Sequence, residues 1–228
     1  MLCYMIVLVL DTETTGLLPK TPDGAYPHIV QLSMRTYDTK TRAKNSTNII
    51  LNPGVEIPAA SIAVHGITNE RAQQEGIPPV DALTLLALEI DNADVLVCHN
   101  LEYDTTVVAK ELERNGLVNV LKKPKMEKYC TMKCSKTLCN IVARSKRTGR
   151  PYIKYPTLSE LYQKLFGAAV VGLHDAHMDT AVTLRCYLRL ALNIDILPQE
   201  LGIQEDLYAE HISHAGSVPT TTGSTVNC

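Results

Sequence analysis

The chain has 228 residues, of which 45% are hydrophobic and 20% are charged, and its formal net charge is −2. These values are typical of a globular protein that buries a substantial core as one domain. The longest apolar stretch, the first ten residues, is too short to span a bilayer and lacks the basic start of a signal peptide, so we expect a strand there rather than a membrane span or a signal peptide.

The cysteines indicate where the protein functions. There are seven of them, an odd number without regular spacing, which indicates reduced thiols in an intracellular protein, either cytoplasmic or nuclear. Three of them, Cys130, Cys134 and Cys139, raise the alternative of structural zinc. Their spacing differs from the CxxC pattern of such sites, so this alternative is disfavoured.

The hydrophobic pattern predicts strands first and then alternating helices and strands. The first strand is the apolar run that ends at Asp11, and further strands are expected at Ile29–Tyr37, Thr47–Leu51 and Asp94–Cys98. Helices are expected at Pro58–Val64, Thr68–Gln74, Val80–Asn92, Asp104–Asn115, Thr157–Phe166 and Met178–Leu192. This order predicts an α/β fold with a mixed sheet. The Ser/Thr/Gly-rich end predicts disorder from about residue 213.

Two acidic residues stand two positions apart at the end of the first strand. On a strand, side chains at i and i+2 point the same way, so Asp11 and Glu13 present two carboxylates from one face. Paired carboxylates are costly unless cations neutralise them, and Mg²⁺ or Mn²⁺ prefers such oxygen ligands. The alternative is an ordinary polar turn, in which Asp, Thr and Gly are common.

Two further acidic residues lie at the start of predicted helices. Asp104 ends the segment HNLEYD, and Asp179 ends the segment HDAHMD. Taken singly, each could simply complement the helix macrodipole. Together with Asp11 and Glu13 they offer four carboxylates near the element ends where an α/β fold places its active crevice, a set that suits two divalent ions.

These motifs resemble those of a known family. DxE, HNxxYD and HxAxxD, in this order, are similar to the three exonuclease motifs of the DEDDh (DnaQ-like) family, which includes the proofreading subunit of bacterial replicative DNA polymerase. The segments HGIT at 65–68 and PTLSEL at 156–161 are further features of that family. The resemblance implies a ribonuclease H-like mixed β-sheet flanked by helices. We expect an exonuclease domain at residues 1–200 and a C-terminal extension at residues 201–228.

By position, the resemblance makes four carboxylates the ligands of two Mg²⁺ or Mn²⁺ ions, namely Asp11, Glu13, Asp104 and Asp179, with His174 as the general base. The histidine subclass is indicated because His174 lies five positions before Asp179. At ~100° per residue, five positions leave these side chains ~140° apart on one helix. We therefore expect His174 in the preceding loop, with Asp175 as N-cap and His177 as the competing base.

The implied reaction is 3′→5′ hydrolysis of terminal phosphodiester bonds, which releases nucleoside monophosphates from single-stranded or frayed DNA 3′ ends. One metal ion lowers the pKa of a bound water, His174 accepts its proton, and the hydroxide attacks in line. The candidates for substrate binding near the motifs are Thr12, Thr14, Leu17 (or Leu18), His65 and Asn100. Asn100 could instead brace Asp104, and His65 could instead be a capped turn histidine.

The charge is unevenly distributed along the chain. Residues 122–154 contain eleven Lys or Arg and one acidic residue, Glu127. A basic segment on an otherwise acidic protein indicates a polyanionic partner, and Arg144, Lys146, Arg147 and Arg150 are candidate phosphate contacts. The alternative is a solvated, flexible loop. With no Trp and one Phe, base stacking would depend on the ten tyrosines.

Two other functions are kept as alternatives. An exoribonuclease that trims RNA 3′ ends would use the same carboxylates and differ in whether it admits a 2′-hydroxyl. A catalytically silent module that binds a polymerase or nucleic acid is disfavoured, because all four carboxylates and the histidine are present. Nucleic acid 3′ ends are thus the expected partner, DNA ahead of RNA, and a DNA polymerase is a candidate protein partner. The oligomeric state stays open.

Overall fold

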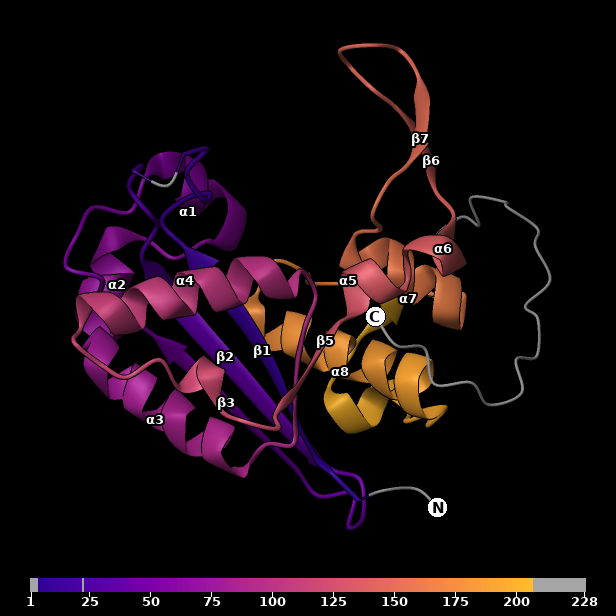
Figure 1. The fold of residues 1–228 in the computed structure, drawn as a ribbon, viewed down its shortest axis with the longest axis horizontal. Helices are drawn as coiled ribbons and strands as arrows, with labels where there is room; N and C mark the ends of the chain where they lie inside the picture. The colour runs from indigo at the N-terminus through magenta and orange to yellow at the C-terminus, as the bar shows by residue number, and fades with distance from the viewer. Residues whose placement is uncertain (1–3, 22, 207–228) are drawn as a thin grey trace.

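A mixed five-stranded sheet lies at the centre of the computed structural model, which describes residues 4–21 and 23–206 (Figure 1). Its strands are β1 (Ile6–Thr14), β2 (Ile29–Asp38), β3 (Lys44–Ile50), β4 (Val95–Cys98) and β5 (Glu127–Cys130). Their order is β3-β2-β1-β4-β5, with β1, β4 and β5 mutually parallel and β2 antiparallel to its neighbours. The carboxyl ends of β1, β4 and β5 therefore meet at one edge of the sheet.

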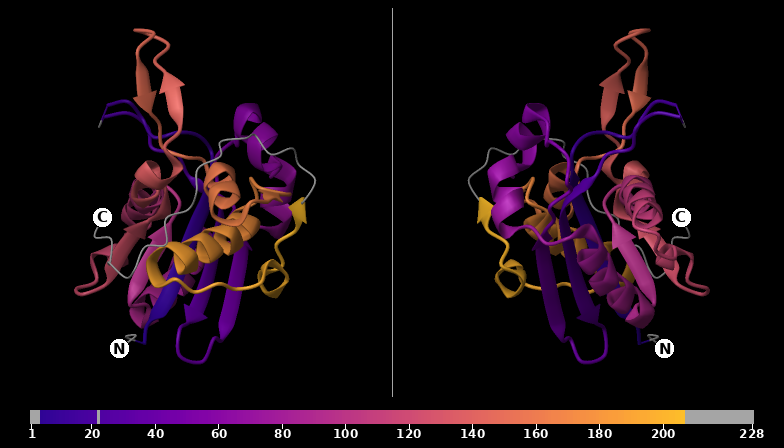
Figure 2. Two further views of the ribbon diagram at one scale, coloured as in Figure 1. Left: turned by 90° about the vertical axis from the view of Figure 1, so that its right-hand side faces the viewer. Right: turned by 90° about the vertical axis from the view of Figure 1, so that its left-hand side faces the viewer.

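Helices cover both faces of the sheet (Figure 2). The helices are α1 (Ala59–His65), α2 (Asn69–Glu75), α3 (Pro79–Asn92), α4 (Leu101–Arg114), α5 (Thr131–Cys134), α6 (Lys136–Cys139), α7 (Leu158–Phe166) and α8 (Ala176–Leu192), with 3₁₀ turns η1 (Val120–Lys122) and η2 (Pro198–Leu201). Helices α3 and α4 pack on one face, and α7 and α8 pack on the other. Two small antiparallel sheets pair β6 (Val142–Arg144) with β7 (Pro151–Ile153), which form a hairpin, and β8 (Ala169–Val170) with β9 (Glu205–Asp206), which lie on either side of α8 in the sequence.

Strand β1 is buried on both faces, and the alternation of its side chains determines which face Asp11 and Glu13 occupy. Leu8 and Leu10 pack in the layer of α3 and α4, whereas Val7 and Val9 pack in the layer of α7 and α8. Asp11 and Glu13 continue the odd-numbered series, so their side chains face the α8 layer.

Most predicted elements are present, but three boundaries near the motifs were wrong. Helix α8 begins at Ala176 rather than at Met178, because Asp175 caps it. Strand β1 continues to Thr14 instead of ending at Asp11, because β2 goes on pairing with it through a bulge between Glu13 and Thr14. Helix α4 begins at Leu101 rather than at Asp104, because Asn100 adopts a left-handed conformation (φ 86°) and ends the turn after β4. Thr68 is the N-cap of α2, and its side chain accepts a hydrogen bond from the Arg71 backbone N–H.

Several elements were not predicted, and some expectations lie outside the described residues. Strand β5, the short helices α5 and α6, and the four short strands β6 to β9 were missed. Within the basic segment, residues 142–153 form the β6–β7 hairpin, which projects from the body of the protein (Figures 1 and 2). The disorder expected from about residue 213 falls beyond the part of the chain that the structure describes. Within that part, no helix combines the length and apolarity needed to cross a bilayer.

Candidate active site

Three carboxylates from two elements converge at the carboxyl end of β1. Asp11, Glu13 and Asp179 each offer an oxygen, and these oxygens all lie within 4.8 Å of one another. The first two come from one face of β1, and Asp179 comes from the first turn of α8, which packs on that face. Oxygen ligands of this kind suit Mg²⁺ and Mn²⁺. Among the described residues, this group consists of carboxylates alone.

The fourth carboxylate, Asp104, approaches from the opposite layer. It lies in the first turn of α4, is only 3% exposed, and its Oδ1 accepts a hydrogen bond from Thr12 Oγ1 at 2.9 Å. Thr12 points to the α4 side of β1, opposite to Asp11, which explains how it reaches this helix. After burial, the charge of Asp104 is the largest cause of the raised pKa of Asp11. Asp104 therefore belongs to the same electrostatic cluster.

Burial and mutual repulsion raise the pKa of the four carboxyls. Burial is the largest cause in each case, and neighbouring carboxylates add to it. The pKa rises to about 8 for Glu13, about 7 for Asp104 and about 6 for Asp179, where the charge of His174 opposes the increase. Oδ1 of Asp179 is also buried without a hydrogen-bond partner among the described residues. Divalent cations fit this donor set, because they would neutralise the repulsion and satisfy the unpaired oxygen.

These pKa values predict how the metal-free protein responds to pH. Without divalent ions, we expect the free energy of unfolding to fall as pH rises from about 5 to about 8. Over this window the folded protein holds protons that the unfolded chain has released, since folding raises the pKa of Glu13 from 4.5 to about 8. Stability is then lost with rising pH. Thermal unfolding in EDTA across this range measures the effect.

Two controls sharpen that measurement. Adding Mg²⁺ or Mn²⁺ should raise the melting temperature more at the alkaline end of the range than at the acidic end. The variant Glu13→Gln should weaken the pH dependence, because it removes the group with the highest of the three numbered pKa values. Equal melting temperatures throughout the range in EDTA would contradict the expected repulsion.

His174 lies in the loop before α8, as the five-residue spacing predicted. Asp175 is the N-cap of α8, and its side chain accepts a hydrogen bond from the His177 backbone N–H at 2.8 Å. The His174 backbone is left-handed (φ 74°), its side chain is exposed, and its backbone N–H bonds the carboxylate of Asp179. This conformation is uncommon for residues other than glycine. The loop thus holds an accessible imidazole next to the carboxylate cluster.

The competing histidine, His177, has a different environment. It lies inside α8, and its Nε2 is 3.4 Å from Nη2 of Arg35, a buried residue of β2. Burial and the charge of Arg35 both lower the pKa of His177. Its ring therefore packs against Arg35, while His174 faces solvent.

Comparison with known proteins identifies the family. The family model RNase T, described as an exonuclease, matches residues 8–187. The chain belongs to this exonuclease family. It is 29% identical over 125 residues to the DNA polymerase III subunit epsilon of Buchnera aphidicola, covering 55% of this chain and 50% of that protein. It is also 38% identical over 98 residues to a DNA polymerase III subunit epsilon-like protein of Rhodobacter capsulatus, covering 42% of this chain and 13% of that protein. The exonuclease chain thus spans half or less of these relatives.

Solved structures of other exonucleases share the fold. E. coli Exonuclease I in complex with a dT13 oligonucleotide superposes with a TM-score of 0.63 at 15% identity, over 81% of this chain and 41% of that one. Exonuclease I from Methylocaldum szegediense gives 0.63 at 16% identity, over 81% of this chain and 40% of that one. The predicted ribonuclease H-like mixed sheet flanked by helices is confirmed.

Both threonines proposed to bind substrate form hydrogen bonds within this exonuclease. Thr12 bonds Asp104, as described above. Thr14 Oγ1 lies 2.7 Å from the carbonyl oxygen of Gly16 and 2.6 Å from the hydroxyl of Tyr103, which donates to the same carbonyl. These bonds fix the turn that follows Glu13.

The other candidates near the cluster differ in what they can offer a nucleotide. The Leu17 side chain is 86% exposed, whereas Leu18 packs against the core. His65 Nδ1 accepts a hydrogen bond from the backbone N–H of Ile67 at 3.1 Å, which is the turn role that we kept as its alternative. The hydrogen bonds to Asp104 come from Thr12 and from the backbone, so Asn100 does not brace it.

Sequence reasoning missed residues that position the motifs. Tyr103 holds the turn after β1, and His99 joins three segments: its Nδ1 is 2.9 Å from Thr131 Oγ1 and its Nε2 is 3.2 Å from the carbonyl oxygen of Pro156. Burial lowers the pKa of His99 to about 4, so the ring stays neutral near pH 7. Both residues belong to the HNxxYD motif, which was a signal that could have drawn attention to them.

Proposed function

We propose that the chain is a metal-dependent 3′→5′ exonuclease of the DEDDh type that releases nucleoside monophosphates from single-stranded or frayed DNA 3′ ends. The observation that carries this proposal is the convergence of three carboxylates whose oxygens lie within 4.8 Å of one another. The charge of a fourth, Asp104, raises the pKa of Asp11 in this group. Membership of the exonuclease family supports the reaction class. The name of the Buchnera relative and the dT13 oligonucleotide bound to E. coli Exonuclease I favour DNA.

The residues of the site have two roles in the proposed hydrolysis, metal binding and proton transfer. Two Mg²⁺ or Mn²⁺ ions would be held by Asp11, Glu13, Asp104 and Asp179. When bound, such ions activate water and neutralise charge on the phosphodiester. His174 accepts the proton of the attacking water at an imidazole nitrogen, which its exposure next to Asp179 permits.

Other side chains seat the terminal nucleotide. Leu17 packs against it from the exposed turn after β1. Asn100 makes no capping hydrogen bond through its side chain, so its amide is available to the substrate. Thr12, Thr14 and His65 contribute to substrate binding indirectly. Through the hydrogen bonds described above, they hold in place the residues and turns that line the site.

The domain organisation and the partner follow from the same proposal. We assign residues 1–200 to the exonuclease domain and residues 201–228 to an extension, of which Ile203 packs in the α7 and α8 layer and β9 pairs with β8. The relatives named as DNA polymerase III epsilon proteins make a DNA polymerase a candidate partner. A pull-down assay with a DNA polymerase would test this partnership independently of the hydrolytic activity.

The proposed function is tested with strands labelled separately at each end. DNA and RNA, paired and unpaired, are offered with Mg²⁺ or Mn²⁺, and the products are resolved by length. We expect a ladder of 5′-labelled DNA fragments that shortens with time, a 3′ label released as mononucleotide, and no cleavage in EDTA. Preferred cleavage of RNA would support the exoribonuclease alternative. Internal cuts, or an absence of cleavage by a folded protein loaded with metal, would overturn the proposal.

A further inference from the structure

The basic hairpin is a distinct arm of the molecule. Strands β6 and β7 are closed by backbone hydrogen bonds from Ser145 N–H to the Arg150 carbonyl at 2.9 Å, and from Lys154 N–H to the Ile141 carbonyl at 2.9 Å. The paired strands project from the body of the protein beyond α6 and α7 (Figures 1 and 2). An isolated two-stranded hairpin is marginally stable in water. A binding partner would therefore help to order this arm.

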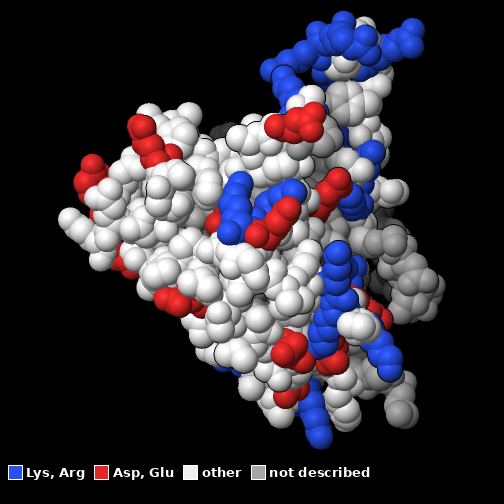
Figure 3. Space-filling model, turned by 60° about the vertical axis from the view of Figure 1, so that its left-hand side comes forward, with Lys and Arg blue, Asp and Glu red and all other residues white. Residues whose placement is uncertain are grey.

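The tip of the arm carries unpaired positive charge. Arg144, Lys146, Arg147 and Arg150 lie on or beside the turn, and none of them forms an ion pair with a described residue. The space-filling view shows Lys and Arg side chains gathered at the end of the arm (Figure 3). No acidic residue occurs between Glu127 and Glu160 in the sequence. The tip is thus suited to a polyanion.

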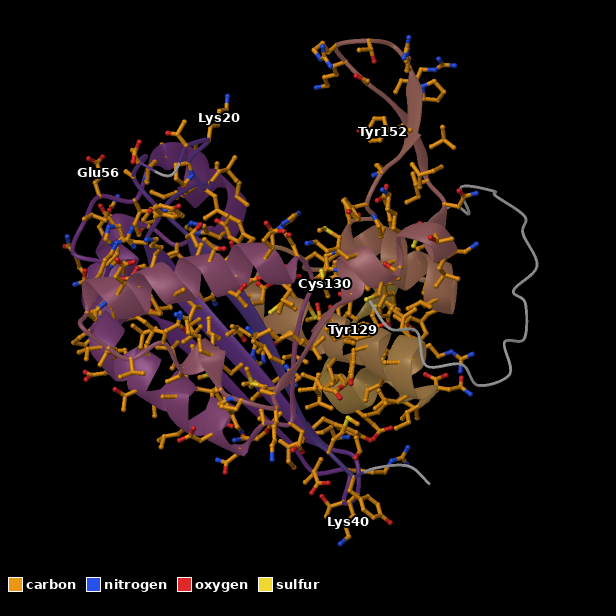
Figure 4. All side chains as sticks on the ribbon, in the orientation of Figure 1. Lys20, Lys40, Glu56, Tyr129, Cys130 and Tyr152 are labelled. Atoms are coloured by element: carbon orange, nitrogen blue, oxygen red, sulfur yellow. The ribbon has the colours of Figure 1, made fainter. Side chains whose placement is uncertain are left out.

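The stem of the arm offers an uncovered aromatic ring. Tyr152 is 51% exposed, and its cross-strand partner is Ala143, whose methyl group is too small to cover the ring. Figure 4 shows Tyr152 on the stem, between the tip and the body. Because an exposed tyrosine face stacks on any unpaired base, basic side chains next to it are typical of single-strand binding surfaces.

The root of the arm is fixed to the edge of the sheet that carries the carboxylates. The His99 imidazole contacts both ends of the segment that bears the arm, through Thr131 and Pro156. His99 follows β4 directly, at the carboxyl edge where Asp11 and Asp104 gather. Lys154 adds an ion pair with Glu160 of α7 at 2.6 Å. The arm therefore starts from the active-site edge and rises away from the body.

We infer that this arm, residues 141–154, binds the single strand on the 5′ side of the nucleotide being removed. Tyr152 stacks on an unpaired base, and the cations of the tip contact the backbone phosphates. The inference rests on the proposed function for the identity of the substrate. Single strand is favoured over duplex because stacked, paired bases do not present their faces to a side chain.

The test compares long and short substrates in the full chain. Tyr152→Ala is matched by Tyr152→Phe, which keeps the ring. The triple variant Lys146→Gln, Arg147→Gln, Arg150→Gln is matched by Lys122→Gln, Lys125→Gln, Lys128→Gln, which removes equal charge from exposed lysines near the amino end of β5. Arg144 is kept because its guanidinium bonds the Gly149 carbonyl within the hairpin. The substrates are a dinucleotide and an oligothymidylate of about 16 nucleotides, the upper end of known single-strand site sizes.

On the long strand, we expect Tyr152→Ala to raise KM by about 5- to 140-fold, the equivalent of ~1–3 kcal/mol of stacking per base, with kcat preserved. Tyr152→Phe should behave like the parent. The tip variant should raise KM and flatten the slope of log affinity against log salt by roughly 0.7 for each phosphate that is no longer neutralised. The lysine control and the hydrolysis of the dinucleotide by every variant should be unchanged.

Binding measured by fluorescence anisotropy in EDTA separates this inference from the proposed function. If the parent binds the long strand and Tyr152→Ala binds it less tightly, the inference that the arm binds single strands is upheld even when no cleavage is found. Equal affinities of the parent, Tyr152→Ala and the tip variant would overturn the inference while hydrolysis of the dinucleotide upholds the catalytic proposal. A tip variant that loses duplex affinity, with no effect of Tyr152→Ala, would show a duplex-binding arm and also overturn it.

Discussion

Replacing any one of the four clustered carboxylates with its amide should reduce cleavage by at least about 10³-fold and leave the fold intact. The variants are Asp11→Asn, Glu13→Gln, Asp104→Asn and Asp179→Asn. Each removes a metal ligand, and the ions supply several kcal/mol of transition-state stabilisation at ~1.4 kcal/mol per tenfold in rate. The rate of mononucleotide release from labelled single-stranded DNA, at saturating Mg²⁺, measures the loss.

The structure supplies a matched control for this experiment. Asp175→Asn makes the same change of charge beside the cluster, and asparagine caps a helix as well as aspartate does, so α8 should be preserved. We expect this variant to keep most of the activity. In EDTA, the four ligand variants should melt at or above the temperature of the parent, because each relieves repulsion among buried carboxylates. Full activity in any ligand variant, or in EDTA, would sink the two-metal proposal.

The second large effect concerns His174. The variant His174→Asn should lose roughly 10²- to 10⁴-fold in rate, the usual contribution of a positioned acid or base. Asparagine tolerates the left-handed backbone found at this position (φ 74°), so the loop and its bond to Asp179 should persist when the imidazole is gone. Single-turnover cleavage measures the rate, and calorimetric titration with Mn²⁺ checks that metal binding survives.

His177→Asn is the paired experiment. This ring packs against Arg35 inside the first turn of α8, so its loss should change stability more than rate. The assignment of the base would be reversed if His177→Asn were the crippled enzyme and His174→Asn remained active. Loss of metal binding in His174→Asn would instead show that the histidine acts through the ligands.

The parts of the site that could be predicted from sequence are those set by local geometry. Asp11 and Glu13 share a face because side chains alternate along a strand. His174 was expected outside α8 because five positions on one helix would leave it ~140° from Asp179, and it lies in the preceding loop. The bond from Thr12 to Asp104 joins residues 92 positions apart. The local sequence pattern gives no sign of a partner so far along the chain, so this contact was not predicted.

The missed elements have similar causes. Strand β5 is four residues long and begins Glu-Lys, so its hydrophobic pattern is weak, and its pairing with β4 is what stabilises it. The strands of the arm, Val-Ala-Arg and Pro-Tyr-Ile, are three residues each, which is too short to show a clear alternation of apolar and polar residues. The start of α4 depends on the left-handed conformation of Asn100, which the chain adopts where β4 ends against its neighbours.

The carboxylate cluster draws on both helix layers, with Asp104 from α4 on one side of the sheet and Asp179 from α8 on the other. A partly folded chain in which either layer has left β1 lacks one of the four carboxylates and so has no complete ligand set. The hydrolytic activity that we propose would then arise only when both layers have docked, at the last stage of assembly. A nascent or unfolding molecule would thereby be harmless to the nucleic acid around it, without any inhibitor to restrain it.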